Sequence, residues 1–497
     1  MTRMKRALTP LVSLVLLTLS ACAPRVTEPL PAAESPPSIT PTLPQPVDAT
    51  PSNSPEEIAT ASLTTSEVTH TSLTHYHLAV ELNYAAKTLA ATQTISYTNN
   101  TDLAIDSLPI LVPPAEVEGV FLLTAIHTEP ASLHTETIMD RAQIDLNFNP
   151  PLAPAQEVTI HLEYQLRLPM RYAAPGYTDR QVLLADWYPL IPPYLQGYGW
   201  LINPPGWVGE YLVYPLINFD LVFCLAPSPN NLVVAASAPV LSTQEGCYHY
   251  SSQEVRNFSL AISPYYQVTA AESELVTAWA YTFPEHAPLG KRAADLAIEA
   301  WATFTELYDS NGRGFLSIVE ADMFDGLETD GLIYLSEWYY QTADPSPQNY
   351  LELLIVHETA HQWFYGYVHN DQAQEPWLDE ALATYSELLF YEVLQPQLAD
   401  WWWDFRVNTY DPQGAVNASI YEFNQYRPYI NAVYLRGAEF IHALRREVGD
   451  PAFFAGLHNY LHTYGINDNF RDSTDFFSAF EGVSGADLTV ISGDYFQ

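Results

Sequence analysis

Positively charged residues are scarce in this chain of 497 residues: 19 Lys and Arg stand against 58 Asp and Glu, which gives a formal net charge of −39. Hydrophobic residues make up 48% of the chain, enough to bury a substantial core, so the acidic excess belongs on the surface. Such a surface repels phosphate backbones and anionic lipid headgroups. The composition therefore argues against nucleic acid as a partner and against charge-driven binding to a membrane.

Long hydrophobic runs are also missing. The apolar stretch from Ala7 to Leu19 follows three basic residues but is too short to span a bilayer comfortably. A basic start, a short apolar run and a small-residue cleavage site are typical of an export signal. We therefore predict a signal peptide over residues 1–21 and a location outside the cytoplasm.

The four residues that end at Cys22, Leu19-Ser20-Ala21-Cys22, resemble a bacterial lipobox. This resemblance implies cleavage before Cys22 and acylation of its thiol. The mature protein would then be a membrane-anchored lipoprotein at the bacterial cell surface or the periplasmic face, with no membrane contact other than the lipid. An ordinary signal peptide with an incidental cysteine is the alternative.

Aromatic residues are absent from residue 23 to residue 75, in a chain that is 13% aromatic overall, whereas ten prolines lie between Pro24 and Pro55. A segment of Pro, Ser, Thr and Ala cannot bury enough apolar surface to fold. We therefore predict an extended, flexible tether over residues 22–73, which would hold a folded body away from the membrane.

Cysteine is rare as well: after Cys22 the chain has only Cys224 and Cys247. Neither belongs to a CxxC pair, and we assign neither as a metal ligand. A single remaining pair in an exported chain is a candidate for one disulfide, with two independent buried thiols as the alternative.

Two regions of the chain differ in the spacing of their apolar residues. Alternation of apolar and polar residues, typical of strands with one buried face, occurs in runs at 78–84, 158–168, 219–225 and 258–262. Helical spacing follows at 290–308, 349–368, 376–394 and 436–450, with a short strand at 316–321. We predict an α+β protein with an N-terminal antiparallel β domain over 74–270 and a mainly helical domain over 271–497.

The second region contains the sequence HETAHQWF, from His357 to Phe364. A helix turns about 100° per residue, so His357 and His361 share one face, with Glu358 beside them. Two imidazoles one turn apart, with a third ligand from elsewhere, suit zinc. The alternative is that two histidines lie four residues apart by chance.

Glu380 is the candidate for the third ligand, because eighteen residues separate it from His361 and it lies near the start of the next predicted helix. Two neutral imidazoles and one carboxylate leave zinc with a net positive charge and one position open for water. Zinc lowers the pKa of such a water and polarises a carbonyl, and Glu358 is adjacent to move the proton. A solvated helix carboxylate is the alternative for Glu380.

The block HETAHQWFYGYVHNDQAQEPWLDEALATYSE, residues 357–387, closely resembles the zinc aminopeptidases of the aminopeptidase N family. Weaker resemblances to the first strands of that family (77–101) and to its YxKG segment (from Tyr434) extend the similarity to about residues 74–490. The resemblance implies a thermolysin-like catalytic domain, one Zn²⁺ per chain and peptide substrates. It implies His357, His361 and Glu380 as zinc ligands, Glu358 as general base and Tyr434 as the donor that stabilises the oxyanion. Tyr429 is our first alternative for the role of Tyr434.

The sequence departs from the family at the loop that binds the free amine of the substrate. Where the family has Gly-x-Met-Glu-Asn, residues 325–329 read DGLET, so only Glu328 matches, and we predict it as the amine-binding residue. Arg436 replaces the lysine of YxKG, and Ala381 replaces the glycine after the third ligand. We also expect no long C-terminal helical domain, and hence a more open cleft.

The sequence thus predicts a lipid-anchored zinc metallopeptidase that removes N-terminal residues from peptides. An open-cleft zinc endopeptidase with the same metal centre is the first alternative. The second is a peptide-binding lipoprotein that keeps the fold without catalysis, although a binding protein has no need for Glu358. The oligomeric state, the preferred side chain and the natural substrate stay open.

The lipobox interpretation predicts that Cys22→Ser releases the protein from the membrane fraction and leaves the catalytic body folded, because the thiol that carries the lipid is gone. Fractionation with immunodetection measures this, and circular dichroism of the released protein serves as the folding control. Membrane retention of a Cys22→Ser variant whose signal has been processed would contradict the prediction.

Overall fold

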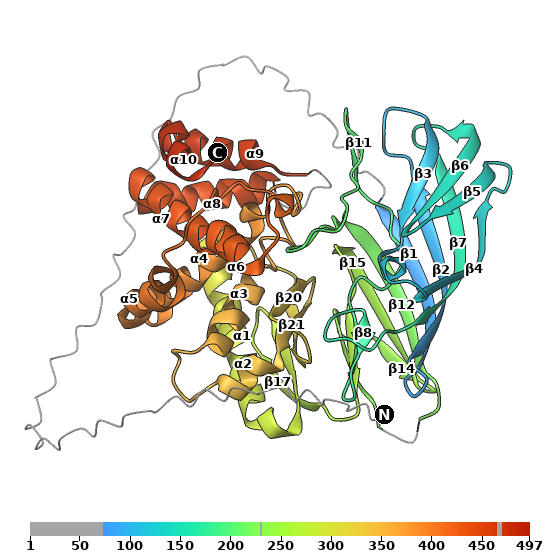
Figure 1. Cartoon of the computed structure of the whole chain (residues 1–497), viewed down its shortest axis with the longest axis horizontal. Helices are drawn as coiled ribbons and strands as arrows, with labels where there is room; N and C mark the ends of the chain where they lie inside the picture. The colour runs from blue at the N-terminus through green and yellow to red at the C-terminus, as the bar shows by residue number, and fades with distance from the viewer. Residues whose placement is uncertain (1–72, 229–230, 465–469) are drawn as a thin grey trace, which may run out of the picture. The chain divides into compact units, whose positions relative to one another are not determined.

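The computed structural model describes residues 73–228, 231–464 and 470–497, so the predicted signal peptide, Cys22 and the predicted tether up to residue 72 lie outside the described residues. Strands come first along the chain and helices later, which confirms the predicted α+β class (Figure 1). Within these described ranges, no helix combines the length and the apolar character that crossing a membrane requires.

A seven-stranded sheet forms the centre of the N-terminal region, in the order β14-β15-β12-β1-β2-β7-β4. Only β1 and β12 run parallel; the other neighbours are antiparallel. Apolar side chains alternate with exposed ones along β1, β2 and β7, so one face packs into a core and the other faces solvent. The strands are β1 Thr74–Asn83, β2 Thr88–Thr98, β4 Phe121–Glu129, β7 Glu157–Arg167, β12 Ile217–Leu225, β14 Ser242–Gln244 and β15 Cys247–Val255.

Smaller sheets complete this region, in the orders β3-β6-β5, β13-β16-β9-β8 and β10-β11. A disulfide joins Cys224 on β12 to Cys247, which lies opposite it on β15. Of the two alternatives from the sequence, a disulfide and two independent thiols, the structure has the disulfide. The strands are β3 Ile105–Leu111, β5 His134–Asp140, β6 Gln143–Leu152, β8 Gly176–Tyr177, β9 Val182–Leu184, β10 Tyr194–Leu195, β11 Gly199–Trp200, β13 Val233–Ala236 and β16 Leu260–Ser263.

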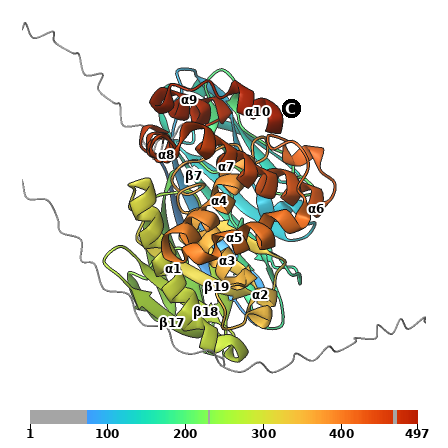
Figure 2. The ribbon, with the colours of Figure 1, turned by 90° about the vertical axis from the view of Figure 1, so that its left-hand side faces the viewer.

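The second region is built on a five-stranded sheet in the order β17-β18-β19-β21-β20. Its three inner strands are parallel, and the two edge strands are antiparallel to their neighbours. Helix α1 packs on β17 and β18 (Figure 2). The strands are β17 Gln267–Glu272, which crosses the predicted boundary at residue 270, β18 Thr277–Thr282, β19 Phe315–Ala321, β20 Gly326–Thr329 and β21 Leu332–Ser336.

Helices that follow the sheet enclose a core of buried aromatic side chains, among them Trp301, Trp363 and Trp377. Two of the helical segments, η4 and η7, are π-helical, with η4 at Trp403–Val407 and η7 at Ile430–Leu435. The α-helices are α1 Ala287–Tyr308, α2 Glu337–Thr342, α3 Tyr350–Ala360, α4 Trp377–Leu394, α5 Ala399–Trp402, α6 Tyr426–Tyr429, α7 Arg436–Val448, α8 Asp450–Tyr464, α9 Ser473–Ser484 and α10 Thr489–Tyr495.

Helix α3 is shorter than the helix predicted over 349–368. Asn349 caps its start, because the Asn349 side chain accepts a hydrogen bond from the backbone N–H of Glu352, but the helix ends at Ala360. The chain then turns sharply, with Tyr365 at a φ of 133°. The prediction was wrong here because buried apolar residues that follow a helix in tight turns give the same sequence pattern as a buried helix.

Candidate active site

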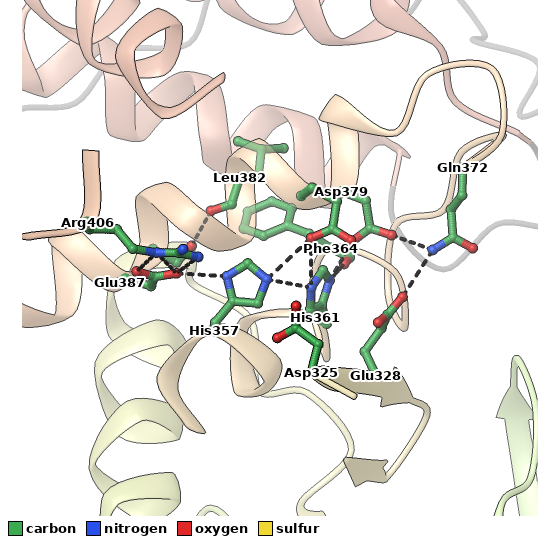
Figure 3. Close-up of polar contacts among 12 residues, drawn as sticks. Asp325, Glu328, His357, His361, Phe364, Gln372, Asp379, Leu382, Glu387 and Arg406 are labelled. Carbon is green, nitrogen blue, oxygen red and sulfur yellow. Dashed lines mark hydrogen bonds and ion pairs between the residues drawn. The ribbon is translucent and has the colours of Figure 1, made fainter. Parts of the chain in front are cut away.

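Helices α3 and α4 pack against each other and bring three predicted ligands together. His357 and His361 lie at the end of α3, and Glu380 lies in the first turn of α4. The two Nε2 atoms are 3.2 Å apart, and Glu380 Oε2 lies 3.3 Å from Nε2 of His357 and 3.5 Å from Nε2 of His361. Figure 3 shows the two imidazoles directed toward one another.

The size of this triangle matches three corners of a zinc site. Zn–N and Zn–O bonds of about 2.0–2.1 Å in a tetrahedron place neighbouring ligand atoms about 3.3–3.4 Å apart. Each histidine contacts a carboxylate through Nδ1, which carries the proton in the neutral ring and leaves the Nε2 lone pair facing the centre. When both rings are neutral, two lone pairs and a carboxylate oxygen converge on one point, an arrangement that fits a shared divalent cation.

Glu387 fixes the ring of His357. Its Oε1 lies 2.9 Å from His357 Nδ1, and it also accepts hydrogen bonds from the guanidinium of Arg406 and from Nε1 of Trp402. Burial disfavours the charge of Glu387, but Arg406 and His357 outweigh this effect and lower its pKa. Glu387 is therefore charged and orients His357 for metal binding (Figure 3).

Asp379 plays the same part for His361. Its Oδ1 lies 2.6 Å from His361 Nδ1, and its Oδ2 accepts a hydrogen bond of 2.6 Å from Nε2 of Gln372. The backbone carbonyl of Phe364 lies 3.0 Å from the same Nδ1. The turn that ends α3 early thus supplies a contact that a continuing helix could not.

Glu358 lies buried beside the metal-binding triangle. Three ligand atoms lie within 4.8 Å of one another: a carboxylate oxygen of Glu328, a carboxylate oxygen of Glu358 and a ring nitrogen of His361. Burial raises the pKa of Glu358 to about 7, opposed by the two histidines. Strand β20 passes so close that a Cβ on Gly326 would lie 2.1 Å from Glu358 Oε1, so any other residue there would displace the Glu358 carboxylate. A carboxylate whose pKa is near neutrality suits a general base.

Glu328, on β20, is buried and faces the same site; Gln372 Nε2 donates a hydrogen bond of 3.3 Å to its Oε1. Glu328 belongs to a cluster of three carboxyl groups. Oxygen atoms of Glu210, Glu328 and Glu380 lie within 4.8 Å of one another. Burial, Glu380 and Asp379 raise the pKa of Glu210 to about 8. Burial and Glu210 raise the pKa of Glu328 well above its ordinary value. Three clustered carboxylates create a strong demand for positive charge.

Glu210 was missed by the sequence interpretation. It comes from residues 203–211, held on the helical region by a hydrogen bond of 2.8 Å from Asn203 Nδ2 to Asp371 Oδ1 and by one of 2.8 Å from Tyr421 Oη to the carbonyl of Pro204. Gly209 has a φ of 71°, and a Cβ there would lie 2.8 Å from Tyr429 Oη. The stretch NPPGWVGE has no periodicity that would mark it, so no local signal could have found Glu210.

Tyr434 lies half-buried on the π-helical segment η7, and its ring is nearly parallel to the imidazole of His357, with 6.0 Å between the centroids. The ring of Tyr429 packs edge-on against it at 5.5 Å. Burial and the charge of Glu380 raise the pKa of Tyr434 well above its ordinary value, so its phenol stays protonated and can donate.

These side chains line one cavity of about 310 Å³. Its walls include the carboxyl groups of Glu210, Glu328 and Glu380, several aromatic rings and Arg427. Asp325, which replaces a family glycine, adopts a φ of 63° and accepts hydrogen bonds from the hydroxyls of Tyr339 and Tyr426. The cavity walls are lined by the residues Gly209, Glu210, Asp325, Gly326, Glu328, Trp338, Tyr339, Tyr350, Leu354, His357, Glu358, His361, Glu380, Arg406, Tyr410, Tyr426, Arg427, Tyr429, Ile430 and Tyr434.

Comparisons with known proteins agree with this geometry. Residues 325–495 match the peptidase family M1 domain. Aminopeptidase N of Lactococcus lactis subsp. lactis is 26% identical over 182 residues, which are 33% of this chain and 21% of that protein. Leucyl aminopeptidase of Saccharolobus solfataricus is 23% identical over 154 residues, which are 29% of this chain and 19% of that protein. The matches thus span about a fifth of the length of these curated relatives.

The fold has a solved counterpart. The crystal structure of an M1 zinc metallopeptidase mutant from Deinococcus radiodurans aligns with a TM-score of 0.60 at 18% identity and covers 86% of this chain and 94% of that chain. The match of residues 325–495 to the peptidase family M1 domain, together with these relatives, confirms the resemblance to the aminopeptidase N family.

The geometry separates metal binding from proton transfer. His361→Ala removes one ligand, so the zinc content should fall by about one ion per chain. Glu358→Gln leaves the three ligands in place and should keep the wild-type zinc content, while turnover falls by about two to four orders of magnitude. Atomic emission spectrometry and peptide hydrolysis measure the two quantities, with His462→Ala, an exposed histidine on α8, as the control. Wild-type turnover of Glu358→Gln would contradict the assigned role.

Proposed function

We propose that the chain is a zinc-dependent aminopeptidase, which hydrolyses the first peptide bond of peptides with a free N-terminus. The observation that carries this proposal is the cluster of Glu210, Glu328 and Glu380. With Glu380 used as a metal ligand, two carboxylates still face the cavity beside the metal centre. They form a site for one more positive charge, and the protonated α-amine of a peptide supplies it.

The cluster also opposes internal cleavage. Opposite charges attract more strongly away from bulk water, so a buried pair of carboxylates binds an ammonium group well. A peptide that continues beyond this point would place neutral amide groups against the two carboxyl groups and supply no positive charge to favour their ionised form. The acidic cluster therefore favours an exopeptidase over the open-cleft endopeptidase, although DGLET keeps only one residue of the family's amine-binding loop.

The residues around the cluster supply the chemistry. Zinc, when bound, acts as a Lewis acid that polarises a carbonyl and acidifies water. Glu358 accepts a proton from the attacking water and delivers it to the leaving amine. Tyr434 donates a hydrogen bond to the oxygen on which negative charge develops, and this stabilises the transition state more than the ground state.

The same proposal places the enzyme outside the cytoplasm, anchored through lipid on Cys22. The support for this part is the basic, apolar and Leu19-Ser20-Ala21-Cys22 pattern of the N-terminus together with the proline-rich segment that follows. An anchored aminopeptidase would act on peptides that reach the cell surface or the periplasm.

The amine site predicts a strong preference for a free N-terminus. Wild-type enzyme should cleave a peptide at its first bond and leave the N-acetylated form of the same peptide intact, because acetylation removes the positive charge. Glu328→Gln and Glu210→Gln should each lower kcat/KM for the free peptide, since each removes one of the two charges. Glu447→Gln, an exposed carboxylate on α7, should have no effect. Mass spectrometry of the products identifies the bond that is cut.

Equal cleavage of the free and acetylated peptides at internal bonds would reject the aminopeptidase and support the endopeptidase. Absence of any cleavage by zinc-loaded wild-type protein that still binds the peptide would support the non-catalytic alternative.

The oxyanion role predicts a loss of turnover in Tyr434→Phe, which removes one hydroxyl and almost no volume. Removal of one such donor typically lowers kcat by about 10²- to 10³-fold with little change in binding. Zinc content and the melting temperature should stay close to wild type. Tyr429→Phe is the matched comparison: if it loses turnover while Tyr434→Phe does not, the role belongs to Tyr429.

A further inference from the structure

The solvent-facing side of the seven-stranded sheet carries the same tripeptide pattern, His-x-Glu, on two neighbouring strands. Strand β4 has His127-Thr128-Glu129 and β7 has His161-Leu162-Glu163. The two histidines lie directly opposite each other in the antiparallel register. Successive residues of a strand point to opposite faces, so both histidines and both glutamates lie on the solvent-facing side.

A β-bulge in β4 produces this alignment. The register shifts between Leu123 and Ala125, so the residues after the shift face the opposite way from what an unbroken strand would give. Leu123 therefore lies on the face of the sheet that packs against the core, whereas His127 and Glu129, four and six residues later, lie on the exposed face. Without the bulge, the two histidines could not meet on one face.

The side chains of His127, Glu129 and His161 lie closer together than the pairing of the two strands alone requires. The imidazole rings of His127 and His161 stack with 4.6 Å between centroids and 21° between planes. One ligand atom each of His127, Glu129 and His161 lies within 4.8 Å of the other two, and His161 Nε2 is 3.8 Å from Glu129 Oε1.

His161 is held in place with one nitrogen unsatisfied. Thr94 Oγ1, on β2, lies 3.1 Å from His161 Nδ1. His161 Nε2 is shielded from solvent and makes no hydrogen bond within the described part of the chain. When the Nδ1–H is donated to Thr94, Nε2 carries a free lone pair 3.8 Å from Glu129 Oε1. A buried, unsatisfied nitrogen beside a second imidazole and a carboxylate indicates a site for a cation.

We propose that His127, Glu129 and His161 bind a second divalent transition-metal ion, of the class that imidazole and carboxylate ligands select: zinc, copper or nickel. The Glu129 side chain is largely exposed and free to close on the metal, and Glu163 flanks the pair from the other side. None of these residues lines the catalytic cavity, so the site is independent of the proposed function.

The position of the site in the sheet suggests what it does. Strand β4 is the last strand of the seven-stranded sheet, and its bulge interrupts the pairing with β7. Edge strands are the part of a sheet most open to fraying and to pairing with other chains. A metal bound by one histidine from each strand would fasten β4 to β7 just beyond the bulge.

Zinc stoichiometry of the whole protein tests this proposal. After equilibration at micromolar free zinc in a chelator buffer, wild type should hold about two zinc ions per chain, and His127→Ala and His161→Ala should each hold about one. His361→Ala should also hold about one, and the double variant His161→Ala/His361→Ala close to none. His249→Ala, on the same sheet four strands from β7, should keep two.

A second measurement follows from linkage, because a metal that binds only the folded state raises its melting temperature. Zinc should raise the melting temperature of His361→Ala but not that of His161→Ala/His361→Ala. One zinc per wild-type chain, or two that persist in both His127→Ala and His161→Ala, would overturn the proposal. Hydrolysis by His127→Ala should equal that of wild type, which separates a failure here from a failure of the aminopeptidase proposal.

Discussion

Nε2 of His357, Nε2 of His361 and a carboxylate oxygen of Glu380 lie 3.2 to 3.5 Å apart. A divalent cation bound by all three atoms fits that arrangement. The surrounding structure maintains it: Glu387 and Asp379 fix the Nδ1 sides of the two rings, and Arg406 and Gln372 hold those carboxylates in turn. Such outer contacts orient metal ligands and raise their basicity.

The acidic cluster beside this centre joins two distant parts of the chain. Glu328 comes from the edge strand β20 of the catalytic sheet, whereas Glu210 comes from a loop more than a hundred residues earlier. The raised pKa values of Glu210 and Glu328 reflect negative charge that is held away from water. The same buried negative charge also attracts a cation to the metal site. One positive charge would come from the metal and the next from the substrate, which makes substrate selection a consequence of the same electrostatics.

Local spacing made part of this site predictable. His357, Glu358 and His361 are placed by one turn of helix, and that relation survives although α3 ends at Ala360, because His361 still has helical φ and ψ values of −62° and −14°. Glu380 required a family signature, because a distance of eighteen residues across a turn is not set by helix geometry. The alternation of apolar residues likewise located strands such as β1, β7 and β12, since one face of that sheet is buried.

Tertiary packing decided what the sequence could not supply. Glu210 carries no local signal, and its role comes from contacts such as Asn203 to Asp371. The end of α3 was misplaced because Trp363 and Phe364 are buried in turns as completely as in a helix. The pairing of His127 with His161 depends on a bulge in β4, where the alternation of buried and exposed residues changes phase, and no strand was predicted there from the sequence.

Anomalous diffraction at the zinc edge, from crystals of the zinc-loaded protein, tests the central claim most directly. The account predicts a peak bonded to Nε2 of His357, Nε2 of His361 and a carboxylate oxygen of Glu380, at about 2.0–2.2 Å from each. A zinc-loaded crystal with no peak between these three residues, or with the peak bound by Glu210 and Glu328 in place of the histidines, would contradict it.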